Sequence, residues 1–249
     1  MFAVFLAGIA AGTVNTVVGS GTLITFPTLL AFGVPPVTAN VSNTIGLVPG
    51  LVSGAIGYRR ESSGQRGRLL RLASASLLGG AVGAVLLLAL PEDAFNAIVP
   101  ALIGLGCVLV IFQPAIARRV AARADSRADL REHGAAWVWF LVFLTGVYGG
   151  YFGAAQGVLL MAIMGIGIQE SLQRLNGTKN VLAGLVNGVA ALIFIVVAEV
   201  DWTVVALIAA GSVIGGQLGA SVGRRLPPLA LRIFIVVVGV VAVVSILVT

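Results

Sequence analysis

The sequence predicts an all-α polytopic membrane protein with two inverted-topology repeats. In each repeat, a broken or re-entrant helical hairpin precedes three transmembrane helices. The prediction rests on composition, on arginine distribution and on an internal similarity. Of the 249 residues, 59% are hydrophobic and 10% charged, and the mean hydropathy is +1.09. This much apolar surface requires hydrocarbon as its solvent. Because the apolar runs are continuous rather than alternating, helices are expected instead of a barrel.

The first region, residues 2–33, is apolar but interrupted by "VNTVVGSGTLITFP", which places a hairpin tip at residues 19–21. Runs long enough to span a bilayer follow at 36–57, 69–90 and 94–112. Region 135–168 is interrupted in the same way at residues 153–157. Its second arm, 158–167, would be about 15 Å long, too short for a core of about 30 Å. Further spans are expected at 178–198, 202–223 and 229–248.

The arginine distribution predicts the orientation of these spans. The connections 58–71 and 113–134 each carry several arginines and should be cytoplasmic, whereas "LPEDAF" and "AEVDW" carry acids only and should face outward. The first hairpin would then enter from outside and the second from inside. This divides the chain into a first repeat at 1–112, a basic cytoplasmic linker at 113–134 and a second, inverted repeat at 135–249.

The two halves also resemble each other at an offset of about 135 residues. Three segments of the first half are similar to segments of the second: "FLAGIAAG" to "FLTGVYGG", "SNTIGLVPGLVSG" to "NGTKNVLAGLVNG", and "GGAVGA" to "GGQLGA". Three matches in the same order indicate a duplication. Inverted repeats with broken helices are typical of transporters whose substrate binds near the midplane between the repeats.

The pattern resembles the TauE/SafE family of sulfite and sulfonate exporters over essentially the whole chain. The resemblance rests on "GIAAGTVNTVVGSGTLITFPTLLAFG" and "GVYGGYFGAAQGVLLMAIMGIG", each followed by a helix with an "SNT" or "NGT" stretch. The second opening is shorter, and Pro27 has no counterpart in it. The resemblance implies transport of small sulfur oxyanions or organosulfonates across the bacterial cytoplasmic membrane, usually outward.

An anion site is expected where the two tips meet. Helix N-termini offer backbone N–H groups and partial positive charge, here from the arm beginning at Thr22 and from Gly157 and Val158. Side-chain donors and Lys179 would add to them, because a lysine this close to the bilayer interior needs a cavity or a partner. The candidate substrate-binding residues are Asn15, Thr16, Gly19, Ser20, Gly21, Thr22, Asn40, Ser42, Asn43, Thr44, Gln156, Gly157, Asn176, Thr178, Lys179 and Asn180.

Purely structural roles are the alternative for these residues. Asn, Ser and Thr commonly cap broken helices or bond across helix pairs. Lys179 near the start of its span could extend to the cytoplasmic face. Gly-x-x-x-Gly pairs such as Gly8/Gly12 and Gly184/Gly188 indicate close helix packing rather than chemistry.

The sequence argues against an enzyme. His133 is the single histidine and lies in a charged loop, and Cys107 is alone in an apolar segment, so no catalytic constellation, metal site or cofactor is expected. The predicted spans contain no Asp or Glu, so potential-driven anion export is favoured over a carboxylate relay. An anion channel, an uptake permease of the same fold and a non-transporting scaffold remain alternatives. The expected partners are a small anion and the lipid bilayer, with a homodimer possible and no nucleic acid.

Overall fold

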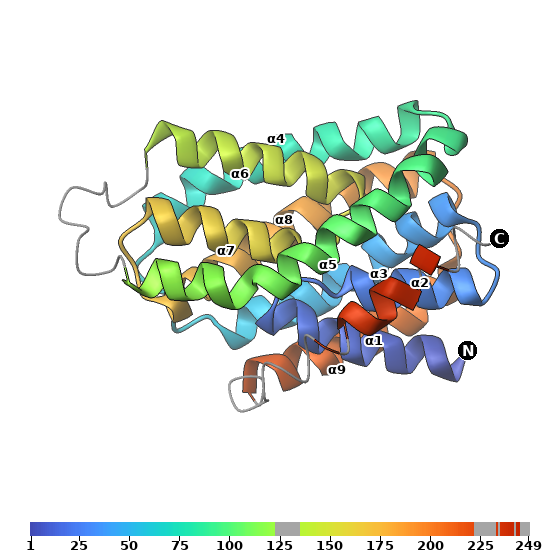
Figure 1. Ribbon diagram of the computed structural model, residues 1–249, viewed down its shortest axis with the longest axis horizontal. Helices are drawn as coiled ribbons and strands as arrows, with labels where there is room; N and C mark the ends of the chain where they lie inside the picture. Colours follow the sequence, from blue (N-terminus) through green and yellow to red (C-terminus); the bar gives the residue numbers. More distant parts are fainter. Residues whose placement is uncertain (123–134, 222–232, 234, 242, 245–249) are drawn as a thin grey trace.

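The computed structural model describes residues 1–122, 135–221, 233, 235–241 and 243–244. The described part consists of helices and their connections, without β-strands, and most helices run along one common direction (Figure 1). The helices are α1 (Phe2–Val17), α2 (Thr22–Ala31), α3 (Pro36–Gly57), α4 (Arg66–Ala89), α5 (Glu92–Ala122), α6 (Ala136–Tyr151), α7 (Gln156–Gly167), α8 (Leu172–Val197) and α9 (Trp202–Ser221).

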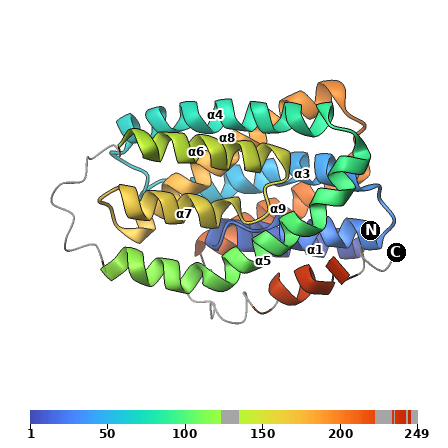
Figure 2. The same ribbon diagram turned by 45° about the horizontal axis from the view of Figure 1, so that its top comes forward.

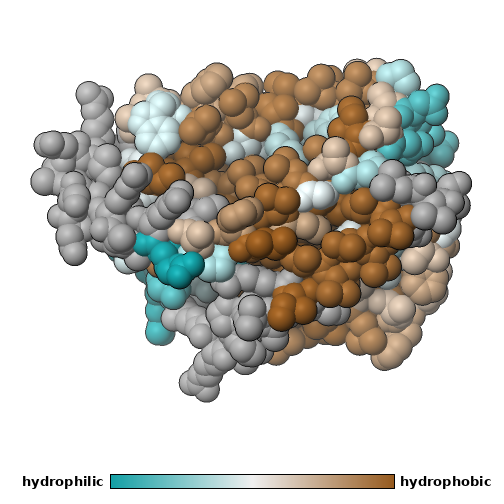
Figure 3. All heavy atoms as spheres, viewed as in Figure 1, coloured by the Kyte–Doolittle hydropathy of each residue, from teal (hydrophilic) through white to brown (hydrophobic). Residues whose placement is uncertain are grey.

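Four of these helices are long and apolar enough to cross a membrane: α4, residues 92–115 of α5, α8 and α9. The bounds of α3 coincide with the predicted span 36–57, and its 22 residues reach about 33 Å. Asn40, Ser42, Asn43 and Thr44 lower its hydropathy, yet all four are buried inside the protein. Hydrophobic residues cover the middle of the molecular face in Figure 3, and hydrophilic residues gather towards its two ends, as a bilayer requires.

Two helices extend beyond the predicted spans. Helix α8 begins at Leu172, six residues before the expected start, after an N-cap at Ser171 whose hydroxyl accepts from the Arg174 N–H. Helix α5 continues to Ala122, so the first half of the expected linker is helical. Gln, Ala and Arg are good helix formers, so a helix can continue where hydropathy falls. The predicted span 229–248 lies partly outside the described residues, and its described part is helical.

Both interrupted hairpins are present. The chain leaves helical geometry at residues 18–21, between α1 and α2, and at residues 152–155, between α6 and α7. Gly19, Gly153 and Ala155 have positive φ values of 86°, 75° and 61°, which redirect the chain at these points. The four arms have 16, 10, 16 and 12 residues, and none is long enough to cross a bilayer alone.

The helices exchange partners between the two halves. Helix α1 packs along α9, and α6 packs along α4, while α3 and α8 pack against each other at the centre (Figures 1 and 2). This reciprocal exchange is what a duplication predicts. The orientation of each half relative to a membrane stays a prediction.

Glycine pairs allow the α1–α9 and α4–α6 approaches. Gly8 lies against Gly211, and a Cβ added to Gly12 would overlap the backbone of Ser212. On the other side Gly146 lies against Gly79 in the same manner. Close packing is therefore confirmed for these glycines. The pair Gly184/Gly188 differs, because an added Cβ there would meet only the Leu51 side chain at 3.7 Å or nothing within 4 Å.

Candidate functional site at the hairpin tips

The two tips meet inside the protein. We define the first tip as residues 18–21 and the second tip as residues 152–157, which include the first two residues of α7. The Gly157 N–H donates a hydrogen bond of 3.0 Å to the Gly19 carbonyl, so the tips are joined through their backbones. A side chain on either glycine would overlap the other tip. Glycine is needed here because the two backbones touch.

The expectation of free N–H groups at the start of each second arm is largely wrong. The Leu23 and Ile24 N–H groups donate to Ser20 and Gly21 carbonyls at 3.2 and 2.9 Å. Asn15 Oδ1 accepts from the Gly21 N–H at 2.9 Å. In the second hairpin, the Val158 N–H donates to the Ala155 carbonyl at 3.0 Å. Tight local turns therefore use most of the donors that an anion would need.

Lys179 connects the end of α1 with the second tip. Its side chain is fully buried, and Nζ donates to the carbonyls of Asn15 and Thr16 at 3.0 Å each. These carbonyls lie at the end of α1, where the helix dipole is negative. The stem passes close to Gly157, since a Cβ added there would lie 3.0 Å from Lys179 Cδ. The cytoplasmic-facing alternative is wrong, because α8 starts earlier than expected and Lys179 lies about two turns inside it.

Asparagines bind the end of the first arm in both halves. Asn176 and Asn180 of α8 donate through Nδ2 to the Thr16 carbonyl at 3.3 and 3.4 Å. Asn40 of α3 donates to the Tyr151 carbonyl, at the end of α6, at 2.9 Å. Each central helix thus binds the broken helix of the opposite half. A lysine, Lys179, binds the carbonyls at the end of α1 but not those at the end of α6.

Three predicted residues do not line the tip cavity and bond to neighbouring elements instead. Ser42 Oγ accepts from the Asp201 N–H at 2.9 Å, beside the start of α9. Thr178 donates to Gln65 Oε1 at 3.0 Å, towards the start of α4. Asn43 bonds to Thr25 and, at 3.4 Å, to the Thr22 hydroxyl, and so fastens α2 to α3. Thr44 is also buried on α3. Successive residues on a helix point about 100° apart, so adjacent polar residues reach different neighbours.

A cavity of about 10 Å³ lies at the tips, with room for about one water molecule. Two buried polar atoms at the tips have no hydrogen-bond partner: Ser20 Oγ, and Nε2 of Gln156, whose side chain lines the cavity. Both can donate to an anion. The lining residues are Asn15, Gly19, Thr22, Leu51, Gly153, Gln156, Gly157, Ala183 and Asn187.

Leu51, Ala183 and Asn187 are lining residues that the sequence reasoning missed. Asn187 could have been found, because it follows Asn176 and Asn180 at intervals of eleven and seven residues, which place the three on one face of a helix. Nothing in the sequence distinguishes Leu51 or Ala183 from other apolar residues.

An ion-pair network lies at the starts of α4 and α8, beyond the end of α7 that is opposite the tips. Glu170 Oε2 contacts Arg68 Nη1 at 3.1 Å and Arg174 Nε at 3.0 Å. Partial burial of Glu170 favours a higher pKa, but the Ser171 N–H and the two guanidinium groups outweigh it, and the pKa of this carboxyl is lowered. Arg68 also donates to Gln65 Oε1 at 2.7 Å, which links the network to Thr178. No cluster that could hold a metal ion occurs within the described ranges.

Comparison with protein families matches residues 4–246 to the family described as sulfite exporter TauE/SafE. The chain belongs to this family. It is 26% identical over 224 residues to the probable membrane transporter protein ORF9 of Sinorhizobium sp., covering 87% of this chain and 80% of that protein. It is 25% identical to a probable membrane transporter protein of Haemophilus influenzae and 24% identical to YfcA of Escherichia coli K12. These alignments cover 87% of this chain and 82% and 78% of the relatives. No solved structure matches. This TauE/SafE protein is a membrane transporter by family.

Proposed function

We propose that the protein exports small sulfur-containing anions, such as sulfite, sulfoacetate or related organosulfonates, across the cytoplasmic membrane by alternating access. The observation that carries the proposal is the meeting of two broken hairpins at a cavity with unsatisfied donors. Gln156 lines this cavity with Nε2 unpartnered, Ser20 Oγ of the first tip is also buried without a partner, and the Lys179 ammonium is bound to the carbonyls at the end of α1. In a transporter with inverted repeats, this is where a substrate is expected.

The anion would bind when the tips separate. A cavity of about 10 Å³ cannot accept a sulfur oxyanion, which has four or more heavy atoms, so this conformation is occluded. Breaking the Gly157–Gly19 bond would open the cavity and release the Gly157 N–H as a further donor. Lys179 stabilises an anion by its charge, while it remains bound to the first hairpin. An occluded centre favours a carrier over an open anion channel.

The membrane potential provides the driving force in this proposal. No Asp or Glu lies among the lining residues of the tip cavity. With a negative interior, outward movement of an anion gains about 2.3 kcal/mol per charge per 100 mV. The basic connection between α3 and α4 would face the cytoplasm, which places the start of α8 on that side.

Counterflow in liposomes tests the proposal. Liposomes that contain the purified protein are preloaded with unlabelled sulfite, sulfoacetate, taurine, sulfate or chloride. Uptake of the same anion in labelled form is then followed. Lys179→Gln is measured beside the unaltered chain. We expect counterflow with at least one sulfur anion, and a reduction of tenfold or more in Lys179→Gln. Conductance without counterflow would indicate a channel, and no flux with any of these anions would remove the substrate assignment.

A further inference from the structure

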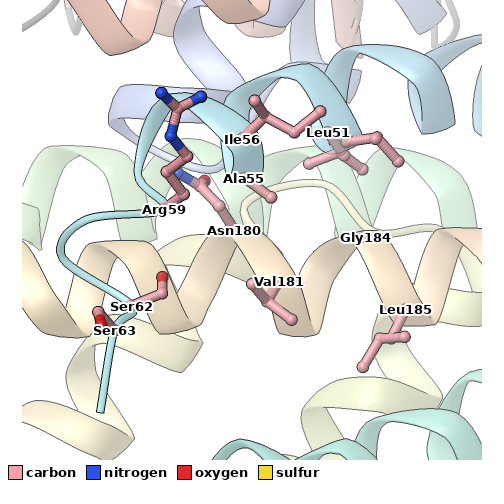
Figure 4. A pocket seen from close by; sticks show the side chains of 11 residues that line it. Leu51, Ala55, Ile56, Arg59, Ser62, Ser63, Asn180, Val181, Gly184 and Leu185 are labelled. Atoms are coloured by element: carbon pink, nitrogen blue, oxygen red, sulfur yellow. The ribbon is translucent and has the colours of Figure 1, made fainter. Parts of the chain in front are cut away.

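A second, larger cavity lies between α3 and α8, on the side of the tips where the α3–α4 connection runs. Its volume is about 530 Å³. In Figure 4, Arg59 and Asn180 lie together at one part of it, Ser62 and Ser63 come from the α3–α4 connection, and Val181 projects from α8. A cavity of this size is large enough for a small organic anion and its water.

Two residues that line this cavity have a buried polar atom without a partner. Ser62 Oγ and Asn180 Oδ1 are shielded from solvent and have no hydrogen-bond partner. Buried polar groups of this kind are normally satisfied by ordered water or a ligand. Arg59, an exposed residue, adds a positive charge to the lining, which attracts anions.

Leu51 separates this cavity from the tips. It lines both the 530 Å³ cavity and the 10 Å³ cavity, and it is the single residue common to the two linings. Leu51 is 3% exposed, and a Cβ added to Gly184 of α8 would lie 3.7 Å from its Cβ. Leu51 is therefore the residue of α3 at which the two cavities adjoin.

We propose that the α3–α8 cavity is the cytoplasmic entrance for the transported anion and that Leu51 is its inner gate. This rests on the proposed function, since it assigns an access route to the same central site. Arg59 and the Ser62 and Ser63 hydroxyls receive the anion at the entrance, and Asn180 links the entrance wall to the end of α1 through its bond to the Thr16 carbonyl.

Cysteine accessibility tests the entrance. Cys107 is the only cysteine, so Cys107→Ser supplies the background. Gly184→Cys places a thiol in the cavity, where its Cβ would meet only Leu51 at 3.7 Å. Leu192→Cys is the matched control, two turns further along α8 at a position that is 69% exposed on the apolar surface. Both are treated with an anionic, membrane-impermeant methanethiosulfonate, from the cytoplasmic face in inverted vesicles and from the outer face in right-side-out vesicles.

We expect Gly184→Cys to react at least tenfold faster than Leu192→Cys from the cytoplasmic face, and slowly from the outer face. Equal, slow reaction of both positions would overturn the entrance. Two other results would also overturn the entrance. Reaction of Gly184→Cys with a hydrophobic maleimide alone would indicate that the thiol faces lipid, and rapid disulfide cross-linking between copies would indicate that it lies in an interface between two copies of the chain. Counterflow by the unaltered chain is measured separately, so a failed entrance and a failed transport function give different results.

The gate is tested with Asn187→Cys, which lines the small cavity beyond Leu51. Adding Leu51→Ala should raise its labelling rate from the cytoplasmic face at least fivefold, because the side chain between the cavities is shortened. Leu47→Ala, a buried leucine one turn earlier on α3, is the control and should leave the rate unchanged. Equal rates with and without Leu51→Ala would overturn the gate. Monodisperse elution of each variant in detergent establishes that it is folded.

Discussion

Gly157→Ala tests the contact between the hairpin tips most sharply. An alanine Cβ there would overlap the backbone of Gly19 and lie 3.0 Å from Lys179 Cδ. The tips would have to separate, and the 3.0 Å bond from the Gly157 N–H to the Gly19 carbonyl would be lost.

The magnitude follows from these contacts. A lost hydrogen bond costs about 0.5–1.5 kcal/mol and overpacking about 1–3 kcal/mol. This loss is partly offset by the higher helix propensity of alanine, which contributes up to about 1 kcal/mol because position 157 lies in the first turn of α7. The net loss is about 2 kcal/mol, which corresponds to a melting temperature lower by about 4–8 °C for a chain of this length.

The assay is thermal unfolding of the detergent-purified protein, followed by far-UV circular dichroism. Gly184→Ala is the control, since the structure gives its Cβ an ordinary contact of 3.7 Å with Leu51. It should melt within about 2 °C of the unaltered chain or slightly above it. If Gly157→Ala melts with the unaltered chain, or if both variants lose the same stability, the close contact of the tips is refuted.

Three further predictions concern the charges. Lys179→Met should lower counterflow at least tenfold, and unaltered counterflow would contradict this. The free energy of unfolding should change by less than about 2 kcal/mol, because the loss of two charge-assisted hydrogen bonds is offset by removal of a buried ammonium. Setting the potential with valinomycin and K⁺ should accumulate a monovalent substrate about 50-fold on the positive side per 100 mV, and no accumulation would refute uniport. Glu170→Gln should cost about 1–3 kcal/mol at neutral pH, and Arg174→Gln, whose side chain is 38% exposed, less than about 1 kcal/mol. Because the pKa of Glu170 is lowered, its contribution is present above the ordinary carboxyl pKa of about 4.3 and is lost as pH falls through the folded-state value. Melting curves should therefore show the Glu170→Gln difference shrinking below about pH 4, and a constant difference would contradict the assignment.

The sequence predicts the framework of the site well. Glycine clusters at residues 19–21 and 153–157 indicate where the helices break, since glycine favours the positive φ of Gly19 and Gly153 and permits the backbone contact between Gly19 and Gly157. The residue-level similarity of the halves indicates that two such breaks belong together. Lys179 is identifiable because a lysine in an apolar helix needs a partner.

Sequence reasoning fails where the direction of a side chain decides its role. Ser42 and Asn43 are neighbours in the chain, but the first bonds to the start of α9 and the second to α2. Thr178 and Lys179 diverge in the same way. Rotation by about 100° per residue separates such neighbours, and only the packing of the surrounding helices determines which of them faces the tips. Leu51 carries no polar signal, so its position between two cavities follows from the structure alone.

Equilibrium binding tests the central claim most directly. The anion that supports the fastest counterflow is titrated, as its ³⁵S form, into the unaltered protein and into the double variant Ser20→Ala, Gln156→Leu. Neither substitution removes a hydrogen bond that the structure describes, since Ser20 Oγ and Gln156 Nε2 are unpartnered, so the double variant should remain folded. We expect its affinity to fall at least tenfold. Equal affinity in the two proteins would contradict an anion site at the hairpin tips.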